Sequence, residues 1–156
     1  MKNCSLLIFR NNMEKLLTVY STYEKLALFL DTPVSTVKSW INGTRNPSLK
    51  TLDKIANKIG CFSYELLCND ASLKNIGFYM NNSHNTFVTN LNIIFLQKHC
   101  ITTPQKLNAL ENVVTDFALQ SYLRKENFKS PTLLKLDLIA DSLGLETYTL
   151  LKENMK

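Results

Sequence analysis

The chain has 156 residues, of which 45% are hydrophobic and 20% charged, a balance typical of a soluble globular protein. Four glycines and four prolines are too few for an all-β fold built on tight turns, and four cysteines are too few for a disulfide scaffold. The net charge of +5 permits a polyanionic partner such as nucleic acid without requiring one.

Apolar residues at helical spacing predict ten helices in two sets of five. The first set is expected near residues 6–19, 22–30, 33–41, 48–59 and 63–68. The second set is expected near residues 86–98, 104–112, 116–125, 131–143 and 146–153. The second helix of each set follows a predicted capping box, Ser21 with Glu24 and Thr102 with Gln105. A polar stretch between the sets predicts domains at 1–70 and 86–156 joined by a linker at 71–85.

The two sets of helices share a repeat at an offset of 84 residues. Within residues 47–60, seven residues recur without a gap in 131–144: Pro47, Leu49, Leu52, Asp53, Ile55, Ala56 and Gly60. The apolar members trace one helical face, and Pro and Gly bound each helix. The sequence therefore predicts an all-α chain made of two tandem five-helix domains.

The residue patterns that usually carry catalysis or metal binding are missing from the sequence. Neither histidine has a partner nearby in the sequence, and we find no Gly-rich phosphate loop, no paired carboxylates at a catalytic spacing and no apolar run of membrane-spanning length. We therefore expect no enzyme activity, no cofactor and no metal. No zinc or redox spacing joins the cysteines, which are expected to be reduced and mostly buried: Cys4, Cys61, Cys68 and Cys100.

The first set of helices carries the pattern Leu26-Ala27, Ser35-Thr36-Val37, Trp40, Gly43 and Pro47. In this spacing it resembles the Cro/phage-repressor (Xre-type) helix-turn-helix family over roughly residues 6–68. The resemblance implies a lambda-repressor-like fold for each domain. One departure is Asp31, which stands where the family usually has Gly in the turn; Asp tolerates a left-handed backbone better than most residues.

The resemblance also implies that the third helix enters the major groove of DNA. No acidic residue occurs from Thr32 to Leu52, so the local charge suits phosphate. The predicted DNA contacts, to bases from the third helix and to phosphates from the segment after it, are Val34, Ser35, Lys38, Ser39, Asn42, Thr44, Arg45 and Lys50.

The second copy is more divergent and more nearly neutral. Residues 1–80 hold ten basic and six acidic residues, whereas residues 81–156 hold eight and seven. Its candidate DNA contacts are Gln120, Ser121, Arg124, Lys125 and Lys129. Two readings stay open: it binds a second DNA half-site, or it is a degenerate copy that mediates dimerisation or docks a protein regulator. Exposure of Phe117, Tyr122 and Phe128 would favour the second reading.

The sequence thus predicts a sequence-specific DNA-binding transcription regulator. We expect a repressor from a phage, mobile element or bacterial operon, acting in the cytoplasm of a bacterial or phage-infected cell. Its partner is double-stranded DNA, read by the tandem domains or by a homodimer. The alternative is an interaction module, antitoxin-like or regulator-docking, that keeps the helix-turn-helix fold without reading DNA specifically.

Overall fold

The computed structural model describes residues 4–71, 73, 77 and 80–153, and these residues form helices in two sets. The first set contains α1 (Ser5–Tyr20), α2 (Tyr23–Phe29), α3 (Val34–Ile41), α4 (Leu49–Ile59) and the 3-10 helix η1 (Ser63–Leu67). The second contains α5 (Ser83–Gln97), α6 (Thr103–Ala109), α7 (Asp116–Tyr122), α8 (Leu133–Leu143) and the 3-10 helix η2 (Thr147–Leu151). The described residues include no β-strand, so the predicted all-α class is confirmed.

Several helix boundaries differ from the predicted ones. The fifth helix of each set is a short 3-10 helix, and α7 ends at Tyr122 instead of continuing to residue 125. Helix α5 begins three residues early because the Asn82 side chain accepts a hydrogen bond from Asn85 N and caps it. It therefore takes residues 83–85 from the predicted linker, of which residues 72, 74–76 and 78–79 lie outside the described part of the chain.

The helix ends show how local sequence decides the boundaries. The capping box of Thr102 and Gln105 is confirmed. The one predicted at Ser21 is wrong, because Thr22 caps α2 by accepting from Lys25 N at 3.2 Å. Gly60 and Gly144 end α4 and α8 with φ of 80° and 69°, the left-handed conformation that glycine adopts most readily.

The repeated segment forms equivalent buried helices in the two sets. In α4 the apolar stripe is buried along its whole length, and in α8 the corresponding residues Leu133, Leu136, Ile139 and Ala140 are buried as well. A buried asparagine also recurs on the first helix of each set. Asn12 Nδ2 donates to Leu66 O at 3.0 Å, and Asn90 Nδ2 donates to Leu150 O at 3.0 Å. Each asparagine therefore ties its own first helix to its own 3-10 helix.

The two sets meet through backbone hydrogen bonds that are reciprocal. Leu49 N donates to Pro131 O at 2.9 Å, and Leu133 N donates to Pro47 O at 3.0 Å. These bonds flank an isolated antiparallel bridge between Ser48 and Thr132. The two donors, Leu49 and Leu133, lie 84 residues apart, and so do the two acceptors, Pro47 and Pro131. Each set therefore makes the same contact to the other.

Two carboxylates form a second pair of reciprocal contacts between the sets, at the N-termini of α1 and α5. Asp137 Oδ2 accepts from Ser5 N at 3.0 Å, and Asp53 Oδ2 accepts from Ser83 N at 3.1 Å. Ser5 and Ser83 are the first residues of α1 and α5, where backbone N–H groups lack helical partners and the helix dipole favours negative charge. Each set therefore caps the first helix of the other.

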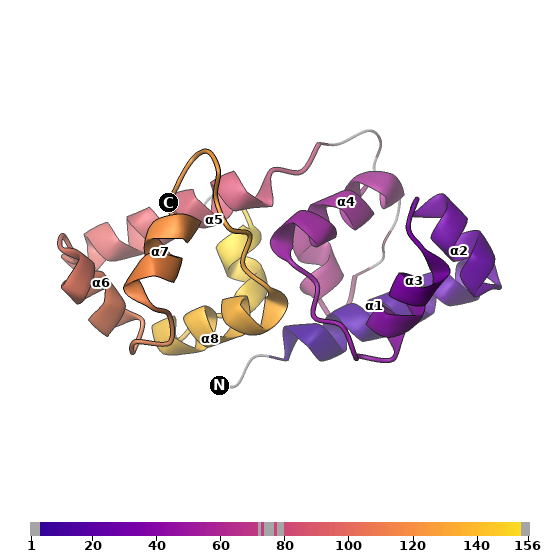
Figure 1. Ribbon diagram of the computed structural model, residues 1–156, viewed down its shortest axis with the longest axis horizontal. Helices are drawn as coiled ribbons and strands as arrows, with labels where there is room; N and C mark the ends of the chain where they lie inside the picture. Colours follow the sequence, from indigo (N-terminus) through magenta and orange to yellow (C-terminus); the bar gives the residue numbers. More distant parts are fainter. Residues whose placement is uncertain (1–3, 72, 74–76, 78–79, 154–156) are drawn as a thin grey trace.

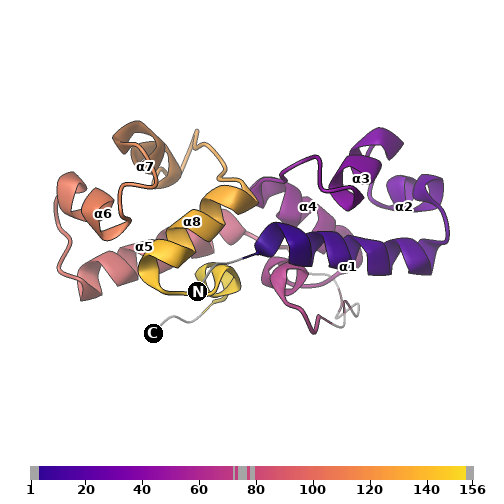
Figure 2. The same ribbon diagram turned by 90° about the horizontal axis from the view of Figure 1, so that it is seen from below.

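The resulting molecule is elongated, with α1–α4 at one end and α5–α8 at the other (Figure 1). In Figure 2 the pairs α2–α3 and α6–α7 lie on the same side, while α1 and α5 lie on the opposite side. Among the described residues, no helix has the length and apolar character required to cross a bilayer.

Asp137 offers a direct test of the contact between the two sets. Asp137→Ala removes the acceptor for Ser5 N and for Thr147 Oγ1, which donates to Asp137 Oδ1 at 2.6 Å. Because buried donors that lose their acceptor are costly, we expect the free energy of unfolding to fall by about 2–3 kcal/mol in urea denaturation followed by circular dichroism. The exposed Asp70 is the control, and its replacement by Ala should change stability by less than about 0.5 kcal/mol. Equal effects for the two variants would contradict the role given to Asp137.

The cysteine prediction holds only in part, because Cys61 is buried while Cys4 is exposed and Cys68 and Cys100 are half-buried. Burial, with a smaller contribution from the negative charge of Glu65, raises the pKa of the Cys61 thiol to about 12. The thiol is therefore protonated at neutral pH and poorly nucleophilic. At pH 8 we expect iodoacetamide to label Cys4 readily and Cys61 only after denaturation, as measured by peptide mass spectrometry. Labelling of Cys61 as fast as Cys4 in the folded protein would contradict this.

Candidate nucleic-acid interface

Helices α2 and α3 form a unit that rests on α1. Leu26 and Ala27 of α2 are buried, as are Val37 and Trp40 of α3. The Trp40 ring meets Phe9 of α1 edge to face, with ring centroids 6.3 Å apart. This buried aromatic contact fixes the rotation of α3 about its axis. The opposite face of α3 consequently points away from the core.

The turn between α2 and α3 adopts the backbone that its sequence predicts. Asp31 has a φ of 48°, so the predicted left-handed conformation is confirmed. Thr32 N closes the turn by donating to Ala27 O at 3.0 Å. Lys54 of α4 donates to Asp31 O and, at 3.2 Å, to Thr32 Oγ1. The turn is thus held both by its own backbone and by a cation from another helix.

The predicted base-reading residues divide by exposure. Ser35 and Lys38 are exposed on α3, and Asn42 is exposed directly after its last residue. Val34 and Ser39 are half-buried, and Ser39 Oγ donates to Ser35 O at 2.7 Å within the helix. The Ser39 hydroxyl is therefore already engaged by its own helix, and the side chains best placed for a partner are the three exposed ones.

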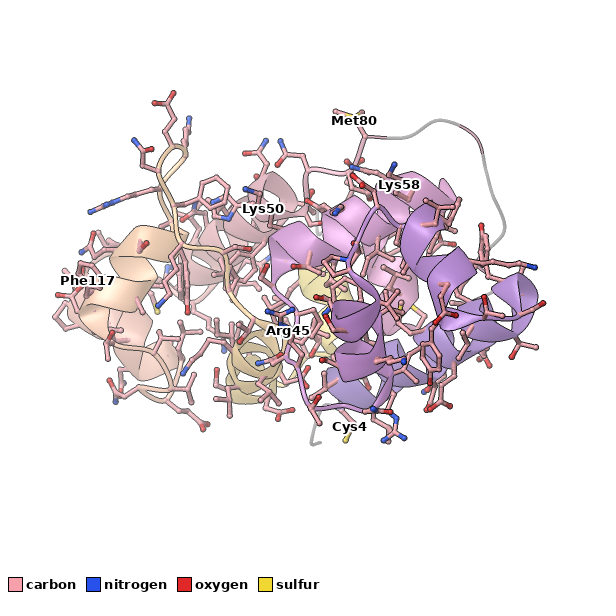
Figure 3. The ribbon with its side chains drawn as sticks, turned by 45° about the vertical axis from the view of Figure 1, so that its right-hand side comes forward. Cys4, Arg45, Lys50, Lys58, Met80 and Phe117 are labelled. Carbon is pink, nitrogen blue, oxygen red and sulfur yellow. The ribbon has the colours of Figure 1, made fainter. Side chains whose placement is uncertain are left out.

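The predicted phosphate contacts are exposed on the segment after α3 and at the start of α4. Arg45 Nη1 donates to Thr36 Oγ1 at 2.9 Å, which holds its guanidinium beside α3, and Thr44 Oγ1 donates to Ser39 O at 3.3 Å. Lys50 lies in the first turn of α4. Figure 3 shows Arg45 and Lys50 on the part of the molecule between the two ends.

The positive charge of this surface is not neutralised by neighbouring carboxylates. Lys38, Arg45, Lys50 and Lys54 form no ion pair with any residue that the structure describes. Sequence reasoning missed Lys54, although it follows Lys50 by four residues and so lies on the same face of α4. The four cations form a surface suited to a polyanion.

The α6–α7 pair repeats this arrangement with different side chains. Leu119 and Tyr122 are buried in α7 as Val37 and Trp40 are in α3, an offset of 82 residues. In this register Gln120 takes the position of Lys38, and Arg124 takes that of Asn42. The connection at residues 110–115 is two residues longer than the one at 30–33.

Four of the five candidate contacts in the second set are exposed: Gln120, Arg124, Lys125 and Lys129. Ser121 is buried, and its Oγ accepts a hydrogen bond from Lys129 N at 3.0 Å. It therefore supports the following loop and is not available to a ligand. Gln120 is exposed, and its Nε2 donates to Asp116 Oδ1 at 3.2 Å.

Of the three apolar residues expected to be exposed in the second set, Phe117 and Phe128 are exposed and Tyr122 is not. Phe117 is 77% exposed and projects from the end of the molecule (Figure 3). Tyr122, however, is 5% exposed, so its predicted exposure is wrong. Phe128 stacks on the buried His84 ring, with centroids 3.3 Å apart, and His84 Nε2 donates to Arg124 O at 2.9 Å. Phe128 and His84 hold the loop after α7 in place.

Comparison with protein families finds a match for part of the chain. Residues 20–66 match the model of a helix-turn-helix family, which covers α2, α3, α4 and nearly all of η1. No curated protein and no solved structure matches the chain. Residues 20–66 are thus similar to a helix-turn-helix family of the Cro type, a family of DNA-binding transcription regulators.

Asp31 provides a test of the turn. Asp31→Gly and Asp31→Ala remove the same carboxylate. They differ because alanine has a Cβ, which makes the positive φ at this position cost about 1 kcal/mol or more, whereas glycine adopts it freely. We expect the Gly variant to exceed the Ala variant in free energy of unfolding by about 1 kcal/mol, measured by thermal and urea denaturation. If the Ala variant were as stable as the Gly variant, the turn would not have the left-handed backbone described above.

Proposed function

We propose that the protein is a sequence-specific transcription regulator that reads the major groove of DNA with α3. The observation that carries the proposal is the exposed face formed by Ser35, Lys38 and Asn42. It lies beside cations that form no ion pair with any described residue. The match of this segment to the helix-turn-helix family supports the same reading. The major groove is wide enough to admit an α-helix, and the domain core holds the buried face of α3 so that the opposite face can enter the groove.

The proposed contacts follow from the chemistry of the side chains. Lys38 donates to the O6 and N7 acceptors of guanine, and Asn42 pairs with the N6 and N7 edge of adenine. Ser35 serves either a base or a phosphate. Thr44, Arg45, Lys50 and Lys54 contact phosphates, which position the protein and make its affinity depend on salt.

We further infer that residues 1–70 and 86–156 are two copies of one domain, the second divergent. The buried stripe of α4 and α8, the asparagine bonds and the shared offset of 84 residues support this inference. A protein of this kind acts in the cytoplasm as a repressor, because occupying a promoter blocks polymerase sterically. A phage, mobile element or bacterial operon is the expected source.

A second candidate function is a protein-interaction module. The observation in its favour is Phe117, an aromatic side chain that is 77% exposed. A pull-down with the full chain that yields one stoichiometric protein, together with no enrichment of any sequence from random DNA, would favour this function over DNA reading.

The test of DNA reading uses a duplex selected from a random DNA pool with the full chain. The double variant Lys38→Ala, Asn42→Ala removes two base contacts, each worth about 1–3 kcal/mol, so we expect its affinity to fall by about 100-fold or more. Gel shifts at moderate salt measure the change, and circular dichroism verifies the fold.

The control is Lys58→Ala, which removes an exposed cation in the last turn of α4, at the opposite end of that helix from Lys50. This variant should bind the selected duplex within about threefold of the parent, the order of the contribution of one distant charge. Unchanged affinity in the double variant would refute the assignment of α3 as the reading helix.

A further inference from the structure

We infer that this chain is a pseudo-dimer within one polypeptide, and that it binds as a monomer to an asymmetric DNA site with two unlike half-sites. Helix α3 reads one half-site and α7 reads the other. The inference rests on the proposed function, and it assigns to the second set of helices a role in DNA reading that no family match assigns.

The first ground is the symmetry of the contact between the two sets. In a two-fold dimer the interface is self-complementary, so that a contact from residue i to residue j is accompanied by one from j to i. Here three pairs of hydrogen bonds between the sets have such counterparts, at offsets of 78 or 84 residues. The reciprocal donor–acceptor pairs are Leu49–Pro131 with Leu133–Pro47, Lys50–Ser130 with Leu134–Asn46, and Ser83–Asp53 with Ser5–Asp137.

The second ground is that this contact uses the surface that a second chain would need. The backbone at the start of α4 and of α8 is already paired across the bridge of Ser48 and Thr132. The N-termini of α1 and α5 are already capped by the carboxylates of Asp137 and Asp53. A second copy of the chain cannot form the same bonds without breaking the internal ones.

The third ground is the position of α3 and α7 in the molecule. Figure 2 shows α3 and α7 on the same side of the molecule, near its two ends. Duplex DNA presents its major groove to one side once per helical turn, about 34 Å or 10 base pairs. Two reading helices on one side of a fixed body are the arrangement that such a duplex requires.

The fourth ground is the chemistry of α7. Gln120 pairs with adenine edges, and Arg124 pairs with guanine, whereas the corresponding residues of α3 are Lys38 and Asn42. The exposed Phe117 suits contact with a thymine methyl group. The loop after α7, held by His84, adds Lys125 and Lys129 for phosphate. Because the two helices carry different readers, the two half-sites must differ.

The test begins with selection of duplexes from a random pool by the full chain, followed by sedimentation of the complex. We expect one chain per duplex and two unlike half-sites with centres about 10 base pairs apart. A palindrome bound by two chains would overturn the inference while leaving the proposed function intact. No enrichment of any sequence would overturn both.

Variants on the selected duplex test the role of α7 directly. Gln120→Ala, Arg124→Ala should lower affinity by about tenfold or more on the intact duplex, and by less than about twofold when the second half-site is scrambled. Lys98→Ala, which removes an exposed cation at the C-terminal end of α5, is the control for lost positive charge and should have little effect on either duplex. An equal loss on both duplexes, or no loss on either, would overturn the assignment.

The spacing between half-sites tests the rigidity of the pseudo-dimer. Five inserted base pairs rotate one half-site by about half a helical turn, so that it faces away from the protein. We expect the affinity to fall to that of a duplex carrying the first half-site alone. Retention of full affinity would mean that α3 and α7 do not read DNA from one fixed body.

Discussion

The carboxylates of Asp53 and Asp137 each accept from the backbone of a first helix in the opposite set and from a hydroxyl in their own set. The first turn of a helix carries N–H groups without helical partners and a partial positive charge, and a carboxylate satisfies both. Helix α1 in turn carries Phe9, against which Trp40 of α3 packs. The direction of α3 relative to α7 therefore depends on two side chains that lie in neither helix.

Sequence reasoning located most helices because their apolar spacing and end signals are local. It missed the 3-10 form of η1 and η2, since five residues contain too little periodicity to separate a 3-10 from an α-helix. It also could not place the two sets relative to each other. The bonds between Pro47, Leu49, Pro131 and Leu133 join backbone atoms, which carry no residue-specific signal.

The sequence predicts the exposure of the candidate side chains better on α3 than on α7. On α3 the family spacing fixed which positions are buried, so Ser35, Lys38 and Asn42 were expected to be exposed, and they are. On α7 the seven-residue helix gave little periodicity, and Ser121 and Tyr122 proved to be buried. Lys54 was overlooked because its link to the turn, through Asp31 O and Thr32 Oγ1, spans more than twenty residues of sequence.

The joining of the two sets in one chain has a consequence for how such a protein changes over generations. In a homodimer every substitution occurs twice, so both reading helices change together and the target must stay symmetric. In this chain α3 and α7 are encoded separately, and a substitution in one leaves the other untouched. The carboxylate contacts between the two sets do not have this independence. A change at Asp53 or Asp137 disturbs a helix in the other half. Helices α3 and α7 are thus free to diverge, while the boundary between the two sets is constrained to stay alike.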